Sequence, residues 1–259
     1  MKKANKRHER ILAIVATESE VSVTKLSQLL GVSVMTIRRD LAYLSRAGKI
    51  NRTHGGATVS RRGILEFEFY ERAETNLPAK QAIARVIAEM VKPGMAIVID
   101  TGTTTLEVAK RLTGIRNLTV LTTSLAIVSE LQSNESTELI LLGGIVRRNS
   151  PDLTGSLTEE NLKRFRTHIA IIGADAVSRD YTYANNPESA RVCQAMVQNT
   201  EKTILAVDSS KFSKTAFARC LPLSEVDVIV TDDACPEEVR TWLLKTGAEV
   251  IFATVKKNK

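Results

Sequence analysis

The spacing of hydrophobic residues changes about a quarter of the way along this 259-residue chain. Over residues 1–60, apolar residues recur at intervals of three and four, as they do on one face of an amphipathic helix. Over residues 78–259, nearly continuous apolar runs alternate with helical patterns, and such runs are typical of strands buried on both faces of a sheet. The pattern predicts two domains joined by a linker over residues 61–77.

The N-terminal domain contains three predicted helices. The first covers residues 6–17, and the second covers residues 25–30 with Thr24 as its cap. The third begins after Ser33, which caps it, and stops at Gly48. Two helices joined by a short turn that contains glycine are typical of a DNA-binding helix-turn-helix.

The third helix has two different faces. Four apolar residues fall on one stripe and are expected to face the core: Val34, Ile37, Leu41 and Leu44. The opposite face carries Met35, Thr36 and Arg39, with Arg38 and Tyr43 on its flanks. In a major groove, arginine can bind guanine, threonine can contact a thymine methyl group or a phosphate, and methionine offers apolar contact.

A hairpin or wing is predicted after the third helix. The segment from Lys49 to His54 alternates and then meets Gly55 and Gly56. Arg52 and His54 can rest there on the phosphate backbone. We therefore expect double-stranded DNA to be contacted by Ser33, Met35, Thr36, Arg38, Arg39, Arg52 and His54. The alternative for Arg38 and Arg39 is solvent exposure with an ion pair to Asp40 or a neighbour.

The distribution of charge supports a polyanionic partner for the first domain. The net charge of the chain is +7, yet residues 1–62 hold 13 Lys/Arg against 4 Asp/Glu, a net of +9. The remainder has a net charge of −2. Such asymmetry indicates nucleic-acid binding by the basic segment, the alternative being a solvated basic surface.

Residues 21–57 resemble the N-terminal signature of the DeoR family of bacterial transcription regulators. The run TIRRDL, Leu44, Gly48, Arg52 and the HGGA sequence from His54 stand where that signature has them. The resemblance implies a winged helix-turn-helix, usually in a repressor of genes for sugar or polyol catabolism.

The predicted linker carries three aromatic residues that alternate partly with glutamates: Phe67, Phe69 and Tyr70. We expect them to pack on one of the domains, with a dimer contact as the alternative. An amphipathic helix follows from Pro78 and ends at Pro93 and Gly94.

The C-terminal domain is predicted to be α/β, with a mostly parallel sheet flanked by helices. The expected strands are 96–100, 118–122, 138–142, 168–173, 203–208, 226–231 and 249–253. The expected helices between them are 104–112, 124–131, 158–165, 187–199 and 237–245.

Small, hydroxylated or acidic residues follow five of these strands. Ligands bind outside the carboxyl ends of strands in open α/β sheets, so we expect an effector site there. The first turn of the helix at Gly102 can hold a phosphate, acidic side chains can accept from sugar hydroxyls, and a lysine can balance the charge. The expected effector-binding residues are Asp100, Gly102, Thr103, Thr104, Thr105, Thr122, Ser124, Gly143, Gly144, Asp175 and Lys211.

Each of these features has a structural alternative. Gly-Thr turns and Gly-Gly pairs often only close a tight corner, and the Asp208-Ser-Ser segment can simply cap a turn. Neither a phosphate-binding Gly-x-x-x-x-Gly-Lys motif nor a dinucleotide-binding Gly-x-Gly-x-x-Gly motif occurs in the sequence, so we expect no cofactor.

The resemblance to the DeoR family continues through the motifs DTGTTT, LTVLTTS, ILLGG, GADA, VDSSKF and IVTDD. It implies a C-terminal domain similar in fold to ribose-5-phosphate isomerase, with a phosphorylated sugar or polyol as effector. Two departures stand out. Thr123 replaces the usual Asn of the family, and residues 179–190 replace a glycine-rich segment.

The choice between enzyme and sensor depends on a general base. Glu188 is the candidate, and we also expect it to line the effector site. The glycine-rich loop that would enclose an isomerase substrate is missing, so a sensor is favoured and no catalytic residue is expected. The alternatives are a sugar-phosphate isomerase that carries a DNA-binding module and an architectural DNA-coating protein.

Helix-turn-helix modules read paired half-sites, which predicts a homo-oligomer, either a dimer or a tetramer. Without an apolar run of 18 residues or an N-terminal apolar segment, we expect a cytoplasmic protein with no membrane partner. Three cysteines and three histidines, with no Cys-x-x-Cys motif, argue against a metal site and a disulfide framework.

Overall fold

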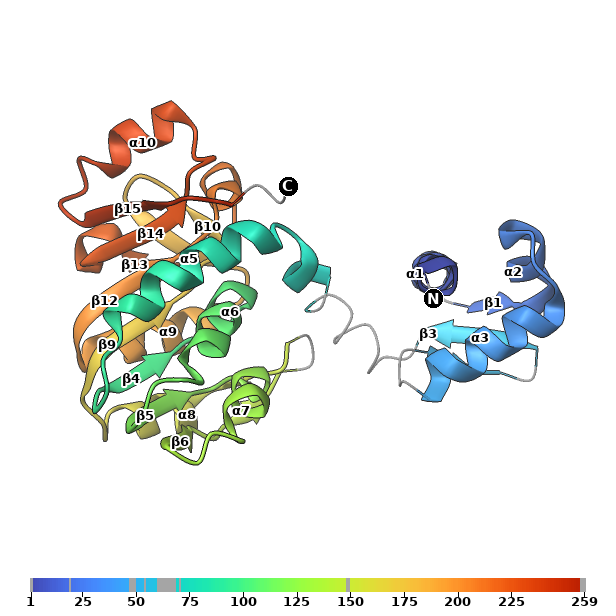
Figure 1. Cartoon of the computed structure of the whole chain (residues 1–259), viewed down its shortest axis with the longest axis horizontal. Helices are drawn as coiled ribbons and strands as arrows, with labels where there is room; N and C mark the ends of the chain where they lie inside the picture. Colours follow the sequence, from blue (N-terminus) through green and yellow to red (C-terminus); the bar gives the residue numbers. More distant parts are fainter. Residues whose placement is uncertain are drawn as a thin grey trace. The chain divides into compact units, whose positions relative to one another are not determined.

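The computed structural model describes residues 2–18, 20–46, 50–53, 55–59, 69, 71–147 and 150–256. The chain divides into two compact units (Figure 1). The first comprises residues 1–72 with 148–150, and the second comprises residues 73–147 with 151–259.

The first unit is a winged helix-turn-helix. Its elements are α1 (Lys2–Glu18), β1 (Glu20–Ser22), α2 (Val23–Leu30), α3 (Val34–Arg46), β2 (Ile50–Arg52) and β3 (Gly56–Val59). The strands form an antiparallel sheet in the order β1-β3-β2. Its core contains Ile11, Val15, Val21, Leu26, Ile37, Leu41, Leu44, Ile50 and Ala57. The predicted helices and hairpin are therefore confirmed.

Two predictions in this unit were wrong. Ser22, and not Thr24, caps α2, because the Ser22 side chain accepts a hydrogen bond from the Lys25 backbone N–H (3.2 Å). Val34 is 39% exposed and lies outside the core, because it is the first residue of α3 and the stripe is buried only from Ile37 onward.

The second unit is built on a seven-stranded sheet with the order β15-β14-β12-β9-β4-β5-β6. The strands are β4 (Ala96–Ile99), β5 (Leu118–Thr122), β6 (Thr137–Leu141), β9 (Thr167–Ile172), β12 (Thr200–Ala206), β14 (Val228–Asp232) and β15 (Glu249–Ala253). All neighbouring pairs are parallel, and all seven correspond to predicted strands.

The helices of this unit are α5 (Leu77–Met90), α6 (Thr103–Leu112), α7 (Leu125–Leu131), α8 (Ser156–Leu162), α9 (Pro187–Gln198) and α10 (Glu237–Leu243). Helix α5 packs on α6 and α6 on α7, whereas α9 packs on α8. Figure 1 shows α5 and α6 in front of the sheet and α9 behind it. Layers on both faces explain why the central strands are buried on both sides.

The connectivity creates a switch point in the sheet. From β4 the chain proceeds outward to β5 and β6, and it then returns to β9, on the other side of β4, before it continues to β12, β14 and β15. The carboxyl ends of β4 and β9 therefore flank the crevice in which open α/β sheets bind ligands.

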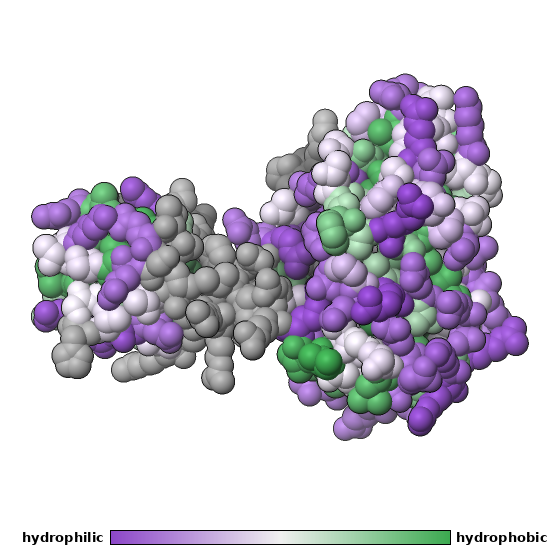
Figure 2. Space-filling view, turned by 180° about the vertical axis from the view of Figure 1, so that it is seen from behind, coloured by the Kyte–Doolittle hydropathy of each residue, from purple (hydrophilic) through white to green (hydrophobic). Residues whose placement is uncertain are grey.

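Two small antiparallel sheets were not predicted. One is the hairpin of β7 (Ile145–Val146) and β8 (Leu153–Thr154). The other has the order β10-β11-β13 and is formed by β10 (Ala176–Val177), β11 (Tyr181–Ala184) and β13 (Ala218–Pro222). Figure 2 shows that the surface of the second unit is mostly hydrophilic, with hydrophobic patches. Ile145 and Val146 contribute apolar surface, being 68% and 58% exposed.

Candidate nucleic-acid interface and effector site

The outer face of α3 is exposed, as predicted. Met35 is 57% exposed, and Arg38 and Arg39 are exposed as well. Among the residues that the structure describes, neither arginine has an ion-pair partner. Asp40 is instead paired with Arg7 and His8, so the proposed ion pair from Arg38 or Arg39 to Asp40 does not form. Both guanidinium groups are therefore available to a ligand.

Ser33 fixes the start of this helix. Its hydroxyl accepts a hydrogen bond from the Thr36 backbone N–H (3.2 Å) and shares a second hydrogen bond with the Thr36 hydroxyl (2.9 Å). The predicted cap is confirmed, and it orients the turn that carries Met35 and Thr36.

The wing places Arg52 at an exposed position at the end of β2. Gly56 must be glycine, because a Cβ there would lie 2.0 Å from the Val21 carbonyl oxygen of the adjacent strand. His54 lies outside the described residues, and so does Gly48.

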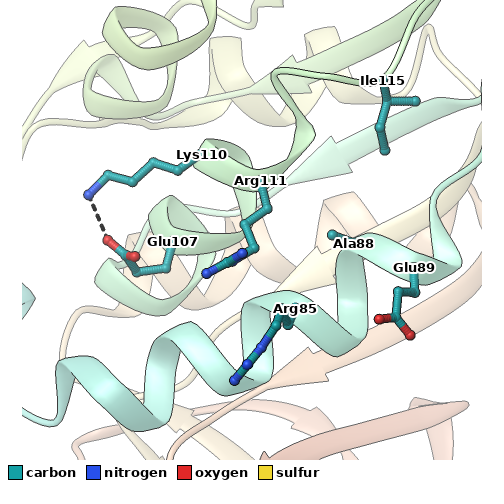
Figure 3. A pocket seen from close by; sticks show the side chains of 7 residues that line it. All are labelled: Arg85, Ala88, Glu89, Glu107, Lys110, Arg111 and Ile115. Atoms are coloured by element: carbon teal, nitrogen blue, oxygen red, sulfur yellow. Dashed lines mark hydrogen bonds and ion pairs between the residues drawn. The ribbon is translucent and has the colours of Figure 1, made fainter. Parts of the chain in front are cut away.

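On the second unit, one hollow lies between α5 and α6 (Figure 3). Its volume is about 530 Å³, and its lining includes Arg85, Glu89, Glu107, Lys110 and Arg111. Glu107 accepts a hydrogen bond from Lys110 (2.6 Å), an ion pair between residues one turn apart. None of the predicted effector-binding residues lines this hollow.

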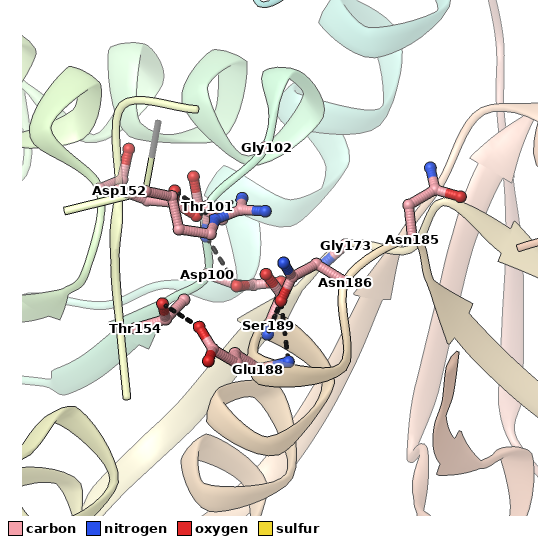
Figure 4. Close-up of polar contacts among 12 residues, drawn as sticks. Asp100, Thr101, Gly102, Asp152, Thr154, Gly173, Asn185, Asn186, Glu188 and Ser189 are labelled. Carbon is pink, nitrogen blue, oxygen red and sulfur yellow. Dashed lines mark hydrogen bonds and ion pairs between the residues drawn. The ribbon is translucent and has the colours of Figure 1, made fainter. Parts of the chain in front are cut away.

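Three predicted residues, Asp100, Gly102 and Glu188, lie instead around the switch point (Figure 4), where Asp100 follows β4 and Gly173 follows β9. The Asp100 carboxylate accepts hydrogen bonds from the backbone N–H groups of Thr101 (2.7 Å) and Gly173 (3.3 Å). Burial raises the pKa of Asp100 to about 7, because the loss of hydration outweighs these two donors. The carboxyl group is thus divided between its charged and neutral forms near neutral pH.

The first turn of α6 begins at the same point. Gly102 is its N-cap residue, and no side chain of the described residues caps the helix there. Thr103 is partly exposed, whereas Thr104 and Thr105 are buried and the Thr105 hydroxyl donates to the Gly102 carbonyl (3.1 Å). Uncapped N–H groups and the helix dipole together attract an anion.

Two buried hydroxyls near this turn have no hydrogen-bond partner within the described part of the chain. They belong to Thr101, which follows Asp100, and to Ser189, in the first turn of α9. Figure 4 shows both side chains close to the Asp100 carboxylate. Buried polar groups usually have a hydrogen-bond partner, so these two hydroxyls are candidate contacts for a bound molecule. Only their positions, after a strand and at a helix start, could have pointed to these two residues in the sequence.

Glu188 and Thr154 lie at the edge of the same crevice (Figure 4). We call this edge, with Asp100, Thr101, Gly102 and Ser189, the rim. The Glu188 carboxylate accepts a hydrogen bond from the Thr154 hydroxyl (3.2 Å), which ties the start of α9 to β8. Asn186 caps α9 by accepting from the backbone N–H groups of Glu188 and Ser189 (2.8 and 3.1 Å). Asn186 and Thr154 were missed because no strand of the predicted sheet precedes them directly.

Arg147 and Asp152 form a further ion pair that was not anticipated. Two hydrogen bonds of 2.7 Å join the Arg147 guanidinium to the Asp152 carboxylate, and Asp152 is 1% exposed. The pair acts on the rim, because Asp152 raises the pKa of Asp100 and Arg147 lowers it.

Four predicted residues have structural partners. The Thr122 hydroxyl donates to the Ile99 carbonyl (2.8 Å), and Ser124 caps α7 by accepting from the Ile127 N–H (3.3 Å). Gly143 and Gly144 form a turn that packs on α8, and the Thr158 hydroxyl of α8 donates to the Gly143 carbonyl (2.7 Å). These residues build the corner beneath the rim, so ligand contact by them rests on the sequence alone.

Asp175 and Lys211 lie at the ends of β9 and β12. The Asp175 carboxylate accepts from the Asn185 N–H (2.8 Å). Lys211 is half-buried on a short 3-10 helix (η1, Ser209–Ser213) that Asp208 caps through the Ser210 N–H (3.1 Å). Burial acts to raise the pKa of Asp208, but hydrogen bonds from Ser210 and Asn76 hold it below its usual value. The capping role considered for Asp208 is confirmed.

Within the described ranges, no helix is long and apolar enough to cross a bilayer. The same residues contain no group of three His, Cys, Asp or Glu side chains suited to a metal ion. The three cysteines Cys193, Cys220 and Cys235 are free and buried.

Comparisons with known proteins identify both domains. Residues 7–62 match the model of the DeoR-like helix-turn-helix domain, and residues 75–233 match that of the DeoR C terminal sensor domain. The putative aga operon transcriptional repressor of Escherichia coli O157:H7 is 30% identical over 96% of this chain and 93% of its own. The transcriptional repressor AccR of Agrobacterium fabrum is 33% identical over 90% and 94%.

The glycerol-3-phosphate regulon repressor of Escherichia coli K12 is 32% identical over 92% of this chain and 94% of its own. Among solved structures, ribose 5-phosphate isomerase A from Methanocaldococcus jannaschii is 19% identical, with a TM-score of 0.39 over 53% of this chain and 55% of that one. The two family models cover most of the chain, and the relatives are named as repressors and not as enzymes. The chain therefore belongs to the DeoR family of DNA-binding transcriptional regulators.

Proposed function

We propose that this regulator represses a carbohydrate or polyol catabolic operon and that a phosphorylated sugar or polyol releases it from DNA. The observation that carries the proposal is the rim at the switch point, where an uncapped helix start adjoins the unpartnered hydroxyls of Thr101 and Ser189. Relatives named for the aga operon and the glycerol-3-phosphate regulon support this class of effector.

The rim offers a distinct role to each kind of group. The N–H groups of Gly102 to Thr105 point along the start of α6 and suit a phosphate. Asp100 and Asp175 suit sugar hydroxyls as acceptors, and Thr101 and Ser189 add hydroxyls that can both donate and accept. Lys211 supplies positive charge after the end of β12, which lies two places from β4 in the sheet. The ligand is thus recognised at one end as an anion and at the other as a polyol.

In this proposal residues 1–60 bind the operator, residues 61–77 link the domains, and residues 78–259 sense the effector and form the oligomer. The residues that contact the operator are Ser33, Met35, Thr36, Arg38, Arg39, Arg52 and His54. Exposed apolar side chains near the β7–β8 hairpin support the oligomer, a dimer or tetramer: Leu141, Ile145, Val146 and Leu157. A chromosome-binding regulator of this kind works in the cytoplasm.

Release follows from linkage between the two ligands. If the effector binds one arrangement of the protein better and DNA binds another better, each ligand weakens the other by the same factor. A coupling free energy of about 2–3 kcal/mol gives roughly 30–150-fold release.

The test is operator binding measured by fluorescence anisotropy for the parent and for Asp100→Ala and Lys211→Ala. Both variants are expected to bind operator DNA normally and to resist release by a sugar phosphate that releases the parent. Normal release of both variants would contradict the proposed site. Binding of the same compound measured by calorimetry, without DNA, separates a lost effector site from a lost coupling.

A further inference from the structure

A partly buried ion cluster joins α1 to the recognition helix α3. The Asp40 carboxylate accepts hydrogen bonds from Arg7 Nε (2.6 Å), Arg7 Nη2 (3.1 Å) and His8 Nε2 (2.9 Å). Asp40 is 6% exposed and lies on α3 beside the buried stripe. A buried carboxylate requires such partners, so this contact fixes α1 against α3.

The charge state of the cluster agrees with its geometry. Burial acts to raise the pKa of Asp40, yet the hydrogen bonds from Arg7 and His8 outweigh it and hold the pKa below its usual range. Asp40 is therefore a carboxylate at neutral pH, and its two acceptor oxygens are both occupied.

The same histidine orients an aromatic ring. The imidazole of His8 stacks on Tyr43 with 5.0 Å between ring centroids and 20° between ring planes. Tyr43 is nevertheless 61% exposed, and its hydroxyl has no hydrogen-bond partner within the described residues. One face of the Tyr43 ring therefore contacts His8, and the phenol hydroxyl is exposed to solvent.

Tyr43, on the flank of the predicted DNA-facing side of α3, is aligned with two residues of that side. Thr36, Arg39 and Tyr43 are spaced at i, i+3 and i+7, so they share one stripe along the helix. The polar side chains at the start of this stripe are the ones proposed to face the major groove. Tyr43 is at its far end, two turns along, where the groove edge and its phosphates come into reach.

We propose that Tyr43 is an additional DNA contact that donates a hydrogen bond to a backbone phosphate, and that Arg7, His8 and Asp40 position its ring. The proposal rests on the proposed DNA-facing side of α3. The tyrosine contact extends the DNA interface beyond the residues that face the bases. The Tyr43 hydroxyl would hold α3 in position along the groove without recognising a base.

The first experiment removes only the hydroxyl. Tyr43→Phe keeps the ring and its stack on His8, and Tyr181→Phe in the second unit is the matched control. We expect Tyr43→Phe to weaken binding to operator and to random DNA equally, by roughly tenfold. The salt dependence, the Tm and the effector affinity stay at the parent values, because no charge is removed.

The second experiment tests positioning through a double-mutant cycle with Asp40→Asn. Without the carboxylate, His8 no longer holds the ring in place, so Tyr43→Phe is expected to cost at most about threefold in the Asp40→Asn background. Additive losses would show that Asp40 does not act through Tyr43. The cycle is measured at a temperature where circular dichroism shows all four proteins folded.

Arg39→Ala separates the possible failures. If Tyr43→Phe binds DNA like the parent while Arg39→Ala loses binding, the tyrosine contact is overturned and the DNA-facing side of α3 stands. If both variants bind like the parent, the proposed DNA-facing side fails and the tyrosine contact fails with it.

Discussion

The two candidate sites satisfy their polar groups in opposite ways. On α3, the arginines of the outer face have no partner among the described residues and extend into solvent. At the switch point, most polar groups are engaged with the fold, and two buried hydroxyls beside an uncapped helix have no partner in the part of the chain that the structure describes. A surface that meets a large polyanion can keep its groups hydrated until binding, whereas a pocket for a small ligand has to be shaped in advance.

The largest expected effect concerns the shape of the pocket. At Gly144 the backbone φ is +125°, and a Cβ would lie 2.0 Å from the Thr158 hydroxyl and 2.7 Å from the Thr154 carbonyl. Gly144→Ala is expected to destabilise the second unit by roughly 3 kcal/mol, from backbone strain and overpacking. Gly114→Ala is the control, because nothing lies within 4 Å of its Cβ position. Thermal unfolding of both variants measures the difference, and equal Tm values would contradict this account of the corner.

The next effect concerns the hydrated face. Arg39→Ala is expected to weaken operator binding by about 2 kcal/mol, or roughly 30-fold, because a guanidinium contact to a base is lost. Effector affinity and Tm stay unchanged. Arg116→Ala removes an equal charge from an exposed position in the second unit and should leave operator binding as it is. Fluorescence anisotropy at fixed salt measures operator binding by both variants. An equal loss of affinity in Arg116→Ala would show that net charge, and not a specific contact of Arg39, explains the effect.

A smaller effect distinguishes a ligand group from a structural one. Thr101→Val removes a buried hydroxyl that has no partner among the described residues, so stability should stay constant or rise slightly. Effector affinity should fall about fivefold to tenfold, the value of one hydrogen bond. Thr231→Val is the matched control, since its hydroxyl is also buried and unpartnered but belongs to β14. Calorimetric titration would contradict the role of Thr101 if both variants bound effector equally.

The last effect is a change of stability with pH, which is observed as a slope and not as a single difference. Burial raises the pKa of Asp100 to about 7, well above its unfolded value near 3.8, so between these pH values the folded state binds more protons. This contribution makes stability fall as pH rises from 4 to 7. Asp100→Asn lacks it, so the Tm of the variant relative to the parent should increase between pH 5 and pH 8. A constant Tm difference over that range would contradict the raised pKa.

The sequence predicted the elements and the chemistry of exposed side chains better than the details of the pocket. The spacing of Ile37, Leu41 and Leu44 determines which face of α3 is buried, and the apolar runs determine the seven parallel strands. Those patterns are local. Val34 broke the pattern because a helix start projects beyond the core.

The pocket depends on distant segments that local patterns do not connect. Arg147 and Asp152 lie at the ends of a hairpin of two-residue strands, and Thr101 and Ser189 lie at the same crevice in Figure 4 although they are distant in the sequence. Thr122 and Ser124 show the converse. Their hydroxyls looked suited to a ligand, but the fold uses them to tie β5 to β4 and to begin α7.

One measurement tests the central claim that a phosphate at the start of α6 controls DNA binding. Full-length protein is bound at fixed salt to labelled DNA from upstream of its own gene, and sugar and polyol phosphates are added singly beside their unphosphorylated forms. The account predicts that one phosphorylated compound releases the DNA, that its unphosphorylated form does not, and that Thr101→Val requires about fivefold to tenfold more of it. Tight, sequence-specific binding that none of these compounds disturbs would contradict the account.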